Sequence, residues 1–352
     1  MSPRSITSRF RRRAALIAGA VLVAVIPAVG MALPAQAAPT IRETAVPTPS
    51  AAPTDLTVGP DGAVWFTEAG ADKIGRLRNG QFTEFPLPAG SEPHGITSGP
   101  DGNLWFAETG ANSIGRMTTT GTLTEFRTQV TFSGPTQITT GPDGNLWFTE
   151  SQGDFIGRIT PDGVMTEVFT GKPSINPEDI TVGPDGNLWF TNFPDPEDLF
   201  PGWVGRISPS TLQIKLFVTS NVGDDVTVPL GIASGPDGNL WITGPGNGTI
   251  GKMTTAGVLT VFHLPQGVTS SPAFITVGTD GALWFTEQGL GANGAAPLAF
   301  GNKIGRITTS GTIREIPIPT QDSAPLGITV GPDRRIWFTE SAGDKIGRVV
   351  TG

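Results

Sequence analysis

One histidine stands among acidic residues in a pattern that could move a proton. His94 follows Glu92 and Pro93, and Glu108 lies a short way further along the chain. An imidazole beside carboxylates can act as a general acid or base near neutral pH. Two carboxylates can also hold a hard cation such as Mg²⁺. We therefore take His94 and Glu108 as candidate catalytic residues, and Glu92 and Glu108 as candidate metal ligands.

The same residue types also have structural uses. A histidine such as His94 can simply hydrogen-bond to neighbouring backbone. The other histidine, His263, lies in an expected outer strand, where we expect it to be exposed on the surface. Glutamates stand at the position of Glu108 in further copies of a repeat: Glu68, Glu150, Glu287 and Glu340. We expect these glutamates to pair with the repeated Lys and Arg rather than to form an active site in every copy.

The elements that position these residues come from an internal repeat. Seven tryptophans keep one sequence context, at spacings between 40 and 53 residues: Trp65, Trp105, Trp147, Trp189, Trp241, Trp284 and Trp337. In the first copy a Gly-Pro-Asp-Gly turn at residues 59–62 precedes the tryptophan, and Ile-Gly-Arg at residues 74–76 follows it. Proline, aspartate and glycine supply the dihedral angles of a tight turn that closes a hairpin. The repeated Gly permits a close approach to a neighbouring strand.

Each copy predicts four short strands. In the second copy they cover residues 96–98, 103–107, 113–118 and 122–126. Seven such units predict an all-β fold, a seven-bladed β-propeller of four-stranded antiparallel blades. A β-solenoid is the rival architecture, but it usually has shorter repeats and no four-strand unit.

The two ends of the repeat region predict how the ring closes. The last copy stops after its third strand, at residues 345–350. The segment 41–48 resembles the outer strand of another copy, residues 313–320. We therefore expect the N-terminal strand of the mature chain to complete the last blade, which leaves no free strand edge at the junction.

The candidate ligand site is the mouth of the central channel. Each copy has a proline just before its innermost strand, and the following residue should point into the channel mouth. Around the ring these substrate-lining candidates are Thr54, His94, Thr136, Glu178, Leu230, Ala273 and Leu326. One half of the ring is polar and the other apolar, which suits an amphipathic ligand. Drift at a variable rim position is the alternative.

Two connections are longer than the rest. Residues 193–203 and 288–302 extend the loops after the second strands of the fourth and sixth copies, and both contain several apolar residues. Long loops of this kind often build a wall over a binding site. They can also be tolerated insertions without a role.

Composition limits the chemistry and the compartment. The 352 residues contain no Cys, which excludes disulfides, zinc–thiolate sites and thiol nucleophiles. Residues 1–37 have a basic start, an apolar run and a small-residue cleavage site at Ala35-Gln36-Ala37. This pattern predicts a secretory signal peptide at 1–37 and a propeller at 38–352, and hence a secreted, extracellular protein. An uncleaved membrane anchor is the alternative.

The charge of the mature chain limits its partners. Removing residues 1–37 takes away five Arg and no acid, and leaves a formal charge of −13. Such a surface repels nucleic acid and anionic lipid. We expect a small-molecule or peptide-like ligand at the channel mouth, no nucleic acid, no membrane contact after cleavage, and a monomer.

The repeat as a whole resembles the virginiamycin B lyases, also called streptogramin lyases. The resemblance rests on the motifs at residues 95–108, 303–308 and 83–88 and covers residues 40–352. It implies an enzyme that opens a cyclic depsipeptide at its ester by elimination, with Mg²⁺ stabilising an enolate. The family's Glu-Pro-His, with a Glu at the end of the next strand, is similar to Glu92, Pro93, His94 and Glu108.

Two positions depart from the family pattern. A second family histidine corresponds to Thr54, and a family tyrosine corresponds to Thr136. A threonine hydroxyl titrates far outside the useful range and cannot carry a proton as imidazole does.

Three functions stay open from the sequence. They are a Mg²⁺-dependent carbon–oxygen lyase, a non-catalytic extracellular propeller that binds a peptide, glycan or envelope component, and a hydrolase of the gluconolactonase kind. Hydrolases of that kind usually have six blades. Metal dependence and the mass of the product distinguish the three.

Overall fold

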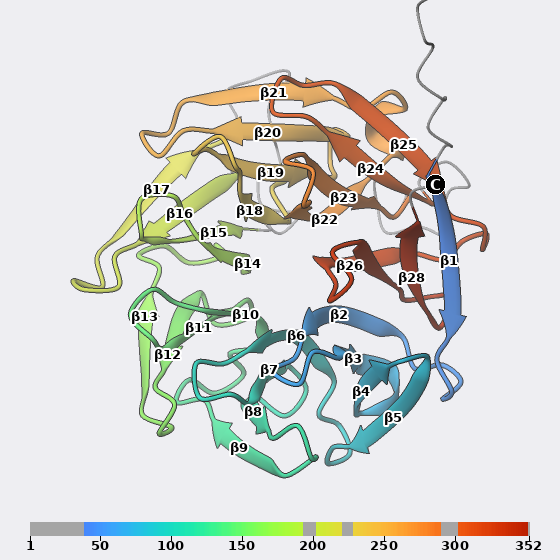
Figure 1. Ribbon diagram of the computed structural model, residues 1–352. Helices are drawn as coiled ribbons and strands as arrows, with labels where there is room; N and C mark the ends of the chain where they lie inside the picture. Colours follow the sequence, from blue (N-terminus) through green and yellow to red (C-terminus); the bar gives the residue numbers. More distant parts are fainter. Residues whose placement is uncertain (1–38, 193–201, 220–227, 290–301, 351–352) are drawn as a thin grey trace, which may run out of the picture. The chain divides into compact units, whose positions relative to one another are not determined.

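The computed structural model describes residues 39–192, 202–219, 228–289 and 302–350 (Figure 1). The expected signal peptide lies outside these residues, as does most of the two long loops at 193–203 and 288–302. Those three expectations therefore stay predictions. In the described part of the chain, no helix is both long and apolar enough to span a membrane.

The described residues form seven antiparallel sheets of four strands each. Blades 1 and 2 contain β2 (Pro53–Val58), β3 (Val64–Glu68), β4 (Lys73–Arg78) and β5 (Gln81–Pro86), then β6 (Pro93–Ser98), β7 (Leu104–Glu108), β8 (Ser113–Met117) and β9 (Leu123–Arg127). Blades 3 and 4 contain β10 (Pro135–Thr140), β11 (Leu146–Glu150), β12 (Phe155–Ile159) and β13 (Met165–Phe169), then β14 (Pro177–Val182), β15 (Leu188–Asn192), β16 (Trp203–Ile207) and β17 (Ile214–Val218).

Blades 5 to 7 repeat the same order. Blade 5 contains β18 (Ile232–Ser234), β19 (Leu240–Gly244), β20 (Thr249–Met253) and β21 (Leu259–His263). Blade 6 contains β22 (Pro272–Val277), β23 (Leu283–Glu287), β24 (Lys303–Ile307) and β25 (Ile313–Pro317). Blade 7 contains β26 (Pro325–Val330), β27 (Ile336–Glu340), β28 (Lys345–Val350) and β1 (Thr40–Ala45).

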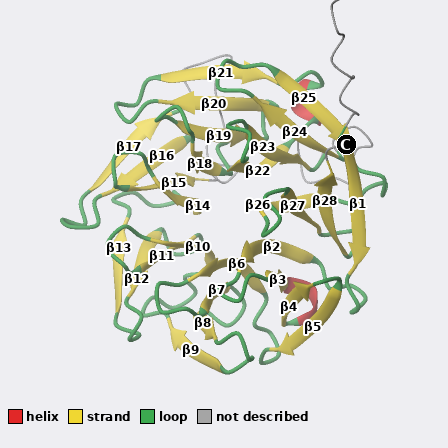
Figure 2. Ribbon diagram, in the orientation of Figure 1, coloured by secondary structure: helices red, strands yellow, loops and turns green. Residues whose placement is uncertain are grey.

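The blades stand around a common centre, with the first strand of each blade innermost (Figure 1). Neighbouring inner strands, such as β2 with β6 and β6 with β10, contact one another around the ring. Apart from the single-turn helices η1 (Ala69–Ala71) and η2 (Gly267–Thr269), the described residues are strands, turns and loops (Figure 2). The predicted seven-bladed propeller is confirmed.

The ring closes as the two chain ends predict. β1 pairs antiparallel with β28, in a register that runs from Thr40 opposite Val350 to Ala45 opposite Lys345. The last blade thus takes its outer strand from the start of the repeat region and its three inner strands from the end. This pairing covers a strand edge that would otherwise stay open.

Contacts at the turn end of each blade, where a turn joins the first and second strands, explain why the same residues recur in the repeat. The indole Nε1 of every repeat tryptophan donates to the turn aspartate four residues earlier, over 2.8–3.1 Å. In blade 2 the guanidinium of Arg116 lies over the ring of Trp105 at 5.6 Å and 3.9 Å from the carboxylate of Asp101. The Arg of the Ile-Gly-Arg motif therefore holds the tryptophan and the turn together.

The glycine of the same motif is required by close packing. A Cβ atom on Gly115 would lie only 2.2 Å from the ring of Phe106 on the neighbouring strand. The corresponding contact recurs between Gly157 and Phe148, at 2.0 Å. The expected close approach at this glycine is confirmed, and the space it leaves is filled by a buried phenylalanine.

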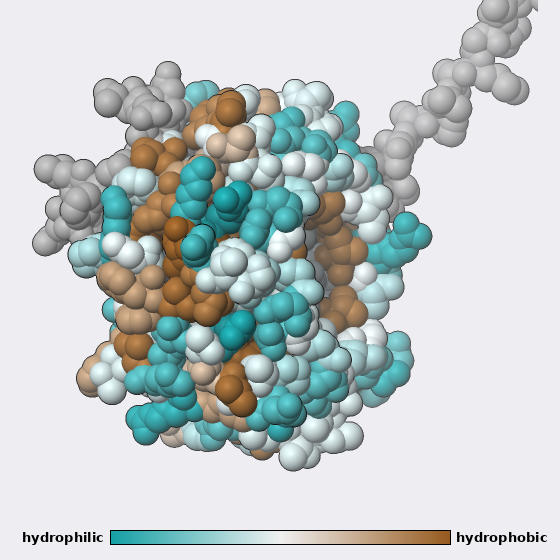
Figure 3. All heavy atoms as spheres, turned by 90° about the vertical axis from the view of Figure 1, so that its left-hand side faces the viewer, coloured by the Kyte–Doolittle hydropathy of each residue, from teal (hydrophilic) through white to brown (hydrophobic). Residues whose placement is uncertain are grey.

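The outer side of the ring carries exposed apolar side chains near blades 3 to 5. Figure 3 looks onto the side with β13 and β17, where apolar residues lie among polar ones. Among the described residues the large exposed apolar side chains are Phe132, Val164, Phe169, Val218 and Val258. These residues lie in loops, turns and outer strands.

Candidate functional site at the channel mouth

The seven predicted mouth residues all occupy the same structural position. Each is the second residue of an inner strand or, in blade 5, lies just before it. The mouth residues thus form one ring at the end of the channel where the inner strands begin. Thr54, His94, Thr136 and Glu178 are half-buried on the polar side of this ring. On the apolar side, Leu230 and Leu326 are half-buried and Ala273 is fully buried.

A β-bulge sets the direction of the mouth residues. In blade 2 the pairing of β6 with β7 shifts register between Pro93 and Ile96, so that His94 and Gly95 stand outside the regular ladder. Five other blades show the same shift, as in blade 1 between Pro53 and Leu56. Bulges re-aim side chains and are common beside binding sites.

Threonine hydroxyls replace the hydrogen bonds that the bulge removes. In blade 1, Thr67 accepts from the backbone N–H of Asp55 at 3.0 Å and donates to the carbonyl of His94 in the next blade at 2.6 Å. The same donation to the next mouth residue recurs at 2.5–3.0 Å from Thr149, Thr191, Thr243, Thr286 and Thr339. Blade 2 has Ala107 at this position and cannot make the bond. The backbone of the mouth is therefore fixed by a repeated bridge, while its side chains are free to differ.

His94 has the properties of a neutral base. Its side chain is half-buried, and burial lowers the pKa of the imidazole, while the nearby carboxylate of Glu92 opposes this effect. Among the described residues, the imidazole has no hydrogen-bond partner. A neutral, unengaged imidazole at a channel mouth can accept a proton from a bound ligand.

Glu92 lies at the mouth but belongs to a turn. It adopts a left-handed φ of 45°, and its N–H donates to Asp72 Oδ1 of the preceding blade at 2.8 Å. Its side chain is exposed and lies beside Gly110, where an added Cβ would sit 3.1 Å from the carboxyl carbon. The structure thus brings His94 and Glu92 together, as expected from the Glu-Pro-His motif.

Glu108 has different neighbours. Its side chain is fully buried, and neither carboxylate oxygen has a hydrogen-bond partner among the described residues. Burial, together with the carboxylate of Glu125 on the outer strand, raises the pKa of Glu108 to about 7, and the nearby hydroxyl of Ser91 opposes this rise. The electrostatic neighbours of Glu108 are thus other acids. Its predicted catalytic and metal-binding roles stay predictions.

The pair formed by Glu108 and Glu125 recurs in other blades. Burial and an outer-strand glutamate together raise the pKa of the inner glutamate in the pairs Glu68 with Glu84, Glu150 with Glu167, Glu287 with Glu315, and Glu340 with Glu43. In blades 4 and 5 both members change together, to Asn192 with Leu216 and to Gly244 with Val261. The two glutamates are thus present or absent as a unit of blade structure.

The lysines bind a different glutamate from the one expected. Lys73, Lys303 and Lys345 form ion pairs of 2.8, 2.6 and 3.3 Å with the outer-strand glutamates. The inner glutamates, of which Glu68 is an example, have no hydrogen-bond partner within the described residues. The expected direct pairing of the inner glutamates with the repeated Lys and Arg is therefore not formed in the described residues, although the lysines lie opposite Glu68, Glu287 and Glu340 and oppose the rise of their pKa values. The cations bind the partner one strand further out.

The donor set for a metal ion is not assembled. In the part of the chain that the structure describes, no three His, Cys, Asp or Glu side chains lie close enough together to hold a metal ion. Glu92 is exposed on a turn, whereas Glu108 is buried beside Glu125. These side chains as placed do not fit a Mg²⁺ site, and magnesium stays a prediction for experiment.

Two half-buried aspartates, Asp55 and Asp179, lie on inner strands next to the mouth residues. Asp55 accepts from the N–H of Ile96 in the next blade at 3.0 Å. In the same way, Asp179 accepts from the N–H of Ile232 in the next blade at 2.8 Å. Burial raises the pKa of Asp55 to about 6 and that of Asp179 to about 7. Burial and Asp179 also raise the pKa of Glu178 to about 8. The polar half of the mouth therefore carries less negative charge than its composition suggests.

The two threonines at the departing family positions have local partners. Thr54 Oγ1 lies 2.8 Å from Thr67 Oγ1 and donates to the carbonyl of Pro93 at 3.2 Å. Thr136 Oγ1 lies 2.8 Å from Ser151 Oγ and donates to the carbonyl of Gly134 at 3.1 Å. Both hydroxyls thus take part in the structure of the rim.

Comparison with known families decides where this propeller belongs. The model of the virginiamycin B lyase family matches residues 30–220 and 202–352. The chain belongs to the virginiamycin B lyase family. A streptogramin B lyase structure is 33% identical, with a TM-score of 0.79, and the match covers 89% of this chain and 98% of that one. Virginiamycin B lyase from Staphylococcus aureus is 35% identical, with a TM-score of 0.78, and the match covers 89% and 99%.

A third lyase structure is that of a histidine variant. It is a catalytically inactive variant of the Staphylococcus aureus virginiamycin B lyase with quinupristin, in which one histidine is replaced by alanine, and it is 36% identical to this chain. More distant matches show the propeller fold alone. They include a putative gluconolactonase, 18% identical with a TM-score of 0.53, and an extracellular domain of a putative two-component system from B. thetaiotaomicron, 15% identical with a TM-score of 0.68.

Sequence reasoning missed two features of this lyase-family site. The bridging threonines were not identified, although Thr follows the Trp-Phe pair in most copies, as at Thr149. The outer partner Glu125 was also missed, although a Thr-Glu pair recurs on outer strands. Both signals are periodic, and each needs the register of neighbouring strands before its meaning is visible.

Proposed function

We propose that this protein is a carbon–oxygen lyase that opens the ester of a cyclic depsipeptide of the streptogramin B class. The observation that carries the proposal is His94, a neutral imidazole without a hydrogen-bond partner in the described structure, on the rim of a channel mouth. Membership of the virginiamycin B lyase family, and the inactivity of a histidine variant of one member, support it.

The chemistry assigns His94 the role of base. His94 accepts the proton α to the carbonyl of the ester-bearing residue, and the electron pair of that C–H bond forms a carbon–carbon double bond. The ester C–O bond breaks at the same time and releases a carboxylate. The carboxylate of Glu92 stabilises the imidazolium that forms. No water is added, so the linear product has the mass of the ring.

The ring of mouth residues fits an amphipathic depsipeptide. Polar groups of the substrate would face Thr54, Thr136 and Glu178, and apolar groups would face Leu230 and Leu326. Because bridging threonines fix the rim backbone, these side chains hold the ring without a costly rearrangement.

The test is mass spectrometry on quinupristin incubated with the purified protein, with Mg²⁺ or with a chelator. We expect a linear product of unchanged mass, and its rate of formation should fall by about 10²–10⁴-fold in His94→Ala. His263→Ala is the matched control, because His263 lies exposed on the outer strand β21. Loss of product in chelator would establish the metal requirement. An intact ring under all conditions would remove depsipeptide opening.

A second function is favoured by the rim threonines. Thr54 and Thr136 stand where the family resemblance places a histidine and a tyrosine, and both hydroxyls are engaged by local hydrogen bonds. A non-catalytic extracellular propeller that captures a peptide, glycan or envelope component is the alternative. Binding of quinupristin without any product would select it. A product with added water would instead select a hydrolase of the gluconolactonase kind.

Export and assembly belong to the same proposal. The leader pattern of residues 1–37 predicts that the secreted protein begins at Ala38, which N-terminal sequencing of culture supernatant would show. We further propose that it is a monomer without affinity for nucleic acid or lipid, as its formal charge suggests. Light scattering coupled to size-exclusion chromatography measures the first property directly.

A further inference from the structure

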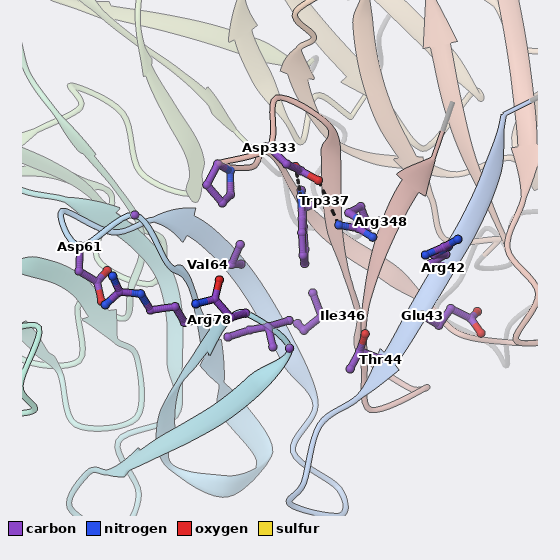
Figure 4. Close-up of a pocket in the computed structure, with 15 residues that line it drawn as sticks. Arg42, Glu43, Thr44, Asp61, Val64, Arg78, Asp333, Trp337, Ile346 and Arg348 are labelled. Atoms are coloured by element: carbon purple, nitrogen blue, oxygen red, sulfur yellow. Dashed lines mark hydrogen bonds and ion pairs between the residues drawn. The ribbon is translucent and has the colours of Figure 1, made fainter. Parts of the chain in front are cut away.

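A cavity of about 750 Å³ lies at the seam between blades 7 and 1, at the far end of the strands from His94 (Figure 4). It opens beside the turns that contain Gly62 and Asp333, which join the first and second strands of the two blades. Trp337, Ile346, Val64 and Leu77 form its apolar part. The volume lies in the range of small-molecule sites.

Trp337 differs from its six counterparts in exposure. The other repeat tryptophans are at most 6% exposed, whereas Trp337 is half-buried and faces the cavity. In blades 1, 2, 4 and 5 the tryptophan stacks on an outer-strand phenylalanine, with ring centroids 5.1–5.7 Å apart: Trp65 on Phe85, Trp105 on Phe126, Trp189 on Phe217 and Trp241 on Phe262. The residue at this register position in blade 7 is Thr44, opposite Ile346. Thr44 is exposed and supplies no ring.

The turn of the next blade also leaves the space open. In blade 2 the turn between β8 and β9 places Gly121 against Phe85, where an added Cβ would lie 2.4 Å from the ring. The corresponding turn of blade 1 is shorter, because β4 and β5 pair as far as Arg78 opposite Gln81. An added Cβ on Gly80 of this turn would meet nothing within 4 Å. Trp337 is therefore left without the two covers that the tryptophans of blades 1, 2, 4 and 5 have.

Arginines line two sides of the cavity (Figure 4). Arg348 lies over Trp337 at 5.2 Å and pairs across the strands with Arg42, and Arg78 lines the opposite wall (Figure 4). Arg348 is bound to Asp333 at 3.1 Å. Neither Arg42 nor Arg78 has an ion-pair partner in the described residues. Three acids, Glu43, Asp61 and Asp333, also line the cavity. Glu43 is bound to Lys345 at 3.3 Å and Asp333 to Arg348, so Arg42 is the cation beside Trp337 and Arg348 that has no acid bound to it.

We propose that the seam cavity binds a small aromatic anion. Its ring stacks on Trp337 in the place that Phe85 takes on Trp65, at the offset distance that aromatic pairs prefer. Its carboxylate or equivalent anionic group faces Arg348 and its cross-strand neighbour Arg42, because guanidinium groups bind such anions in bidentate geometry. This site is separate from the channel mouth and goes beyond the proposed lyase function.

The decisive variant fills the stacking position on Trp337 with a phenylalanine side chain introduced into the protein itself. The probe is naphthalene-2-carboxylate, and binding is measured by isothermal titration calorimetry on the full chain. We expect Thr44→Phe to weaken binding at least about ten-fold, because the new ring occupies the stacking position on Trp337. Thr260→Phe places the same residue on the exposed outer strand β21 and should leave binding unchanged. Absence of probe binding to the unaltered protein, or equal binding to Thr44→Phe, would overturn the proposal.

A second arm tests the charge. Replacing Arg42 with Gln should weaken binding of naphthalene-2-carboxylate, while neutral naphthalene-2-methanol should bind weakly to every form. Equal affinity for the acid and the alcohol would contradict recognition of an anion. Thr44→Phe should leave depsipeptide opening unchanged, so that failure of this site and failure of the lyase assay are distinguishable.

Discussion

The two ends of the blade strands differ in how closely they repeat. At the turn end, all seven blades make the same hydrogen bond from the tryptophan to the turn aspartate. The Arg or Lys on the third strand lies over the tryptophan ring in each blade. At the mouth end, the seven residues that follow the strand-initiating proline are of five different types. A contact that recurs in every blade serves the fold. Variation on a fixed backbone is what a ligand site requires.

The mouth end itself contains both kinds of residue. The threonine bridges and glutamate pairs recur in most blades, whereas the proline-adjacent side chains do not. Position along the strand therefore does not distinguish structural residues from candidate site residues. The structural side chains bind the next blade or strand, whereas the candidate site residues are left facing the channel.

The largest expected effect lies at the turn end. Trp105→Leu removes a fully buried indole, its stacking on Phe126 and its bond to Asp101, and should lower the free energy of unfolding by about 3 kcal/mol. Urea unfolding measures it. Trp337→Leu is the matched variant and should cost less, because Trp337 is half-exposed and has no ring stacked on it among the described residues. Equal costs would contradict the difference between the two tryptophans.

The glutamate pairs predict a stability that falls as pH rises. The folded-state pKa values of Glu150, Glu287 and Glu340 are raised to about 8 by burial, above the value of an unfolded glutamate. The folded chain therefore binds more protons than the unfolded chain in the range between the unfolded and the folded pKa values. This contribution to stability is lost as the pH rises through that range, from about pH 5 to about pH 8.5. The melting temperature should be higher at pH 5 than at pH 8.5.

One substitution isolates this effect. Glu150→Gln cannot ionise, so it should raise the melting temperature at pH 8.5 and reduce the difference between the two pH values. The effect should be about 1.4 kcal/mol for each unit by which the pKa is displaced. Asp162→Asn, at an exposed acid in a turn, is the control and should leave the pH dependence unchanged. A melting temperature that rises with pH would show that these carboxylates are ionised and paired in the fold.

The smallest expected effect restores the missing threonine bridge. Ala107→Thr would place a hydroxyl between the N–H of Gly95 and the carbonyl of Thr136, as Thr67 does one blade earlier. We expect a gain of about 1 kcal/mol in the free energy of unfolding. Thr149→Ala, which removes an existing bridge, should cost a similar amount. A loss of stability in Ala107→Thr would show that blade 2 has a different geometry at its rim.

The fold could be predicted almost completely from sequence because each blade is a local unit. The turn at residues 99–102, the buried Trp105 and the strand spacing all follow from nearby residues. Even the long-range pairing of β1 with β28 was predictable, because residues 41–48 repeat the pattern of an outer strand. In blade 2 the observed strands β7, β8 and β9 agree with the predicted ones to within one residue at each end, whereas β6 begins earlier, at Pro93 rather than Ile96.

The candidate site was less predictable than the fold because it depends on the directions in which side chains point. The sequence places Glu108 and His94 in one blade, but it does not show that the neighbour of Glu108 is Glu125. The seam cavity has no motif at all. It arises from two small changes, Thr44 in place of an aromatic residue and a shorter turn at Asn79 and Gly80, which lie in different blades.

The most direct test of the central claim uses the two histidines of the chain. Histidine-selective NMR yields one signal for His94 and one for His263, and quinupristin is added at a pH near neutral. The account predicts that the His94 imidazole titrates below its ordinary value of about 6.5 and that only its signal moves with the depsipeptide. A His94 signal that is unaffected by the depsipeptide at every pH would contradict a ligand site at the channel mouth.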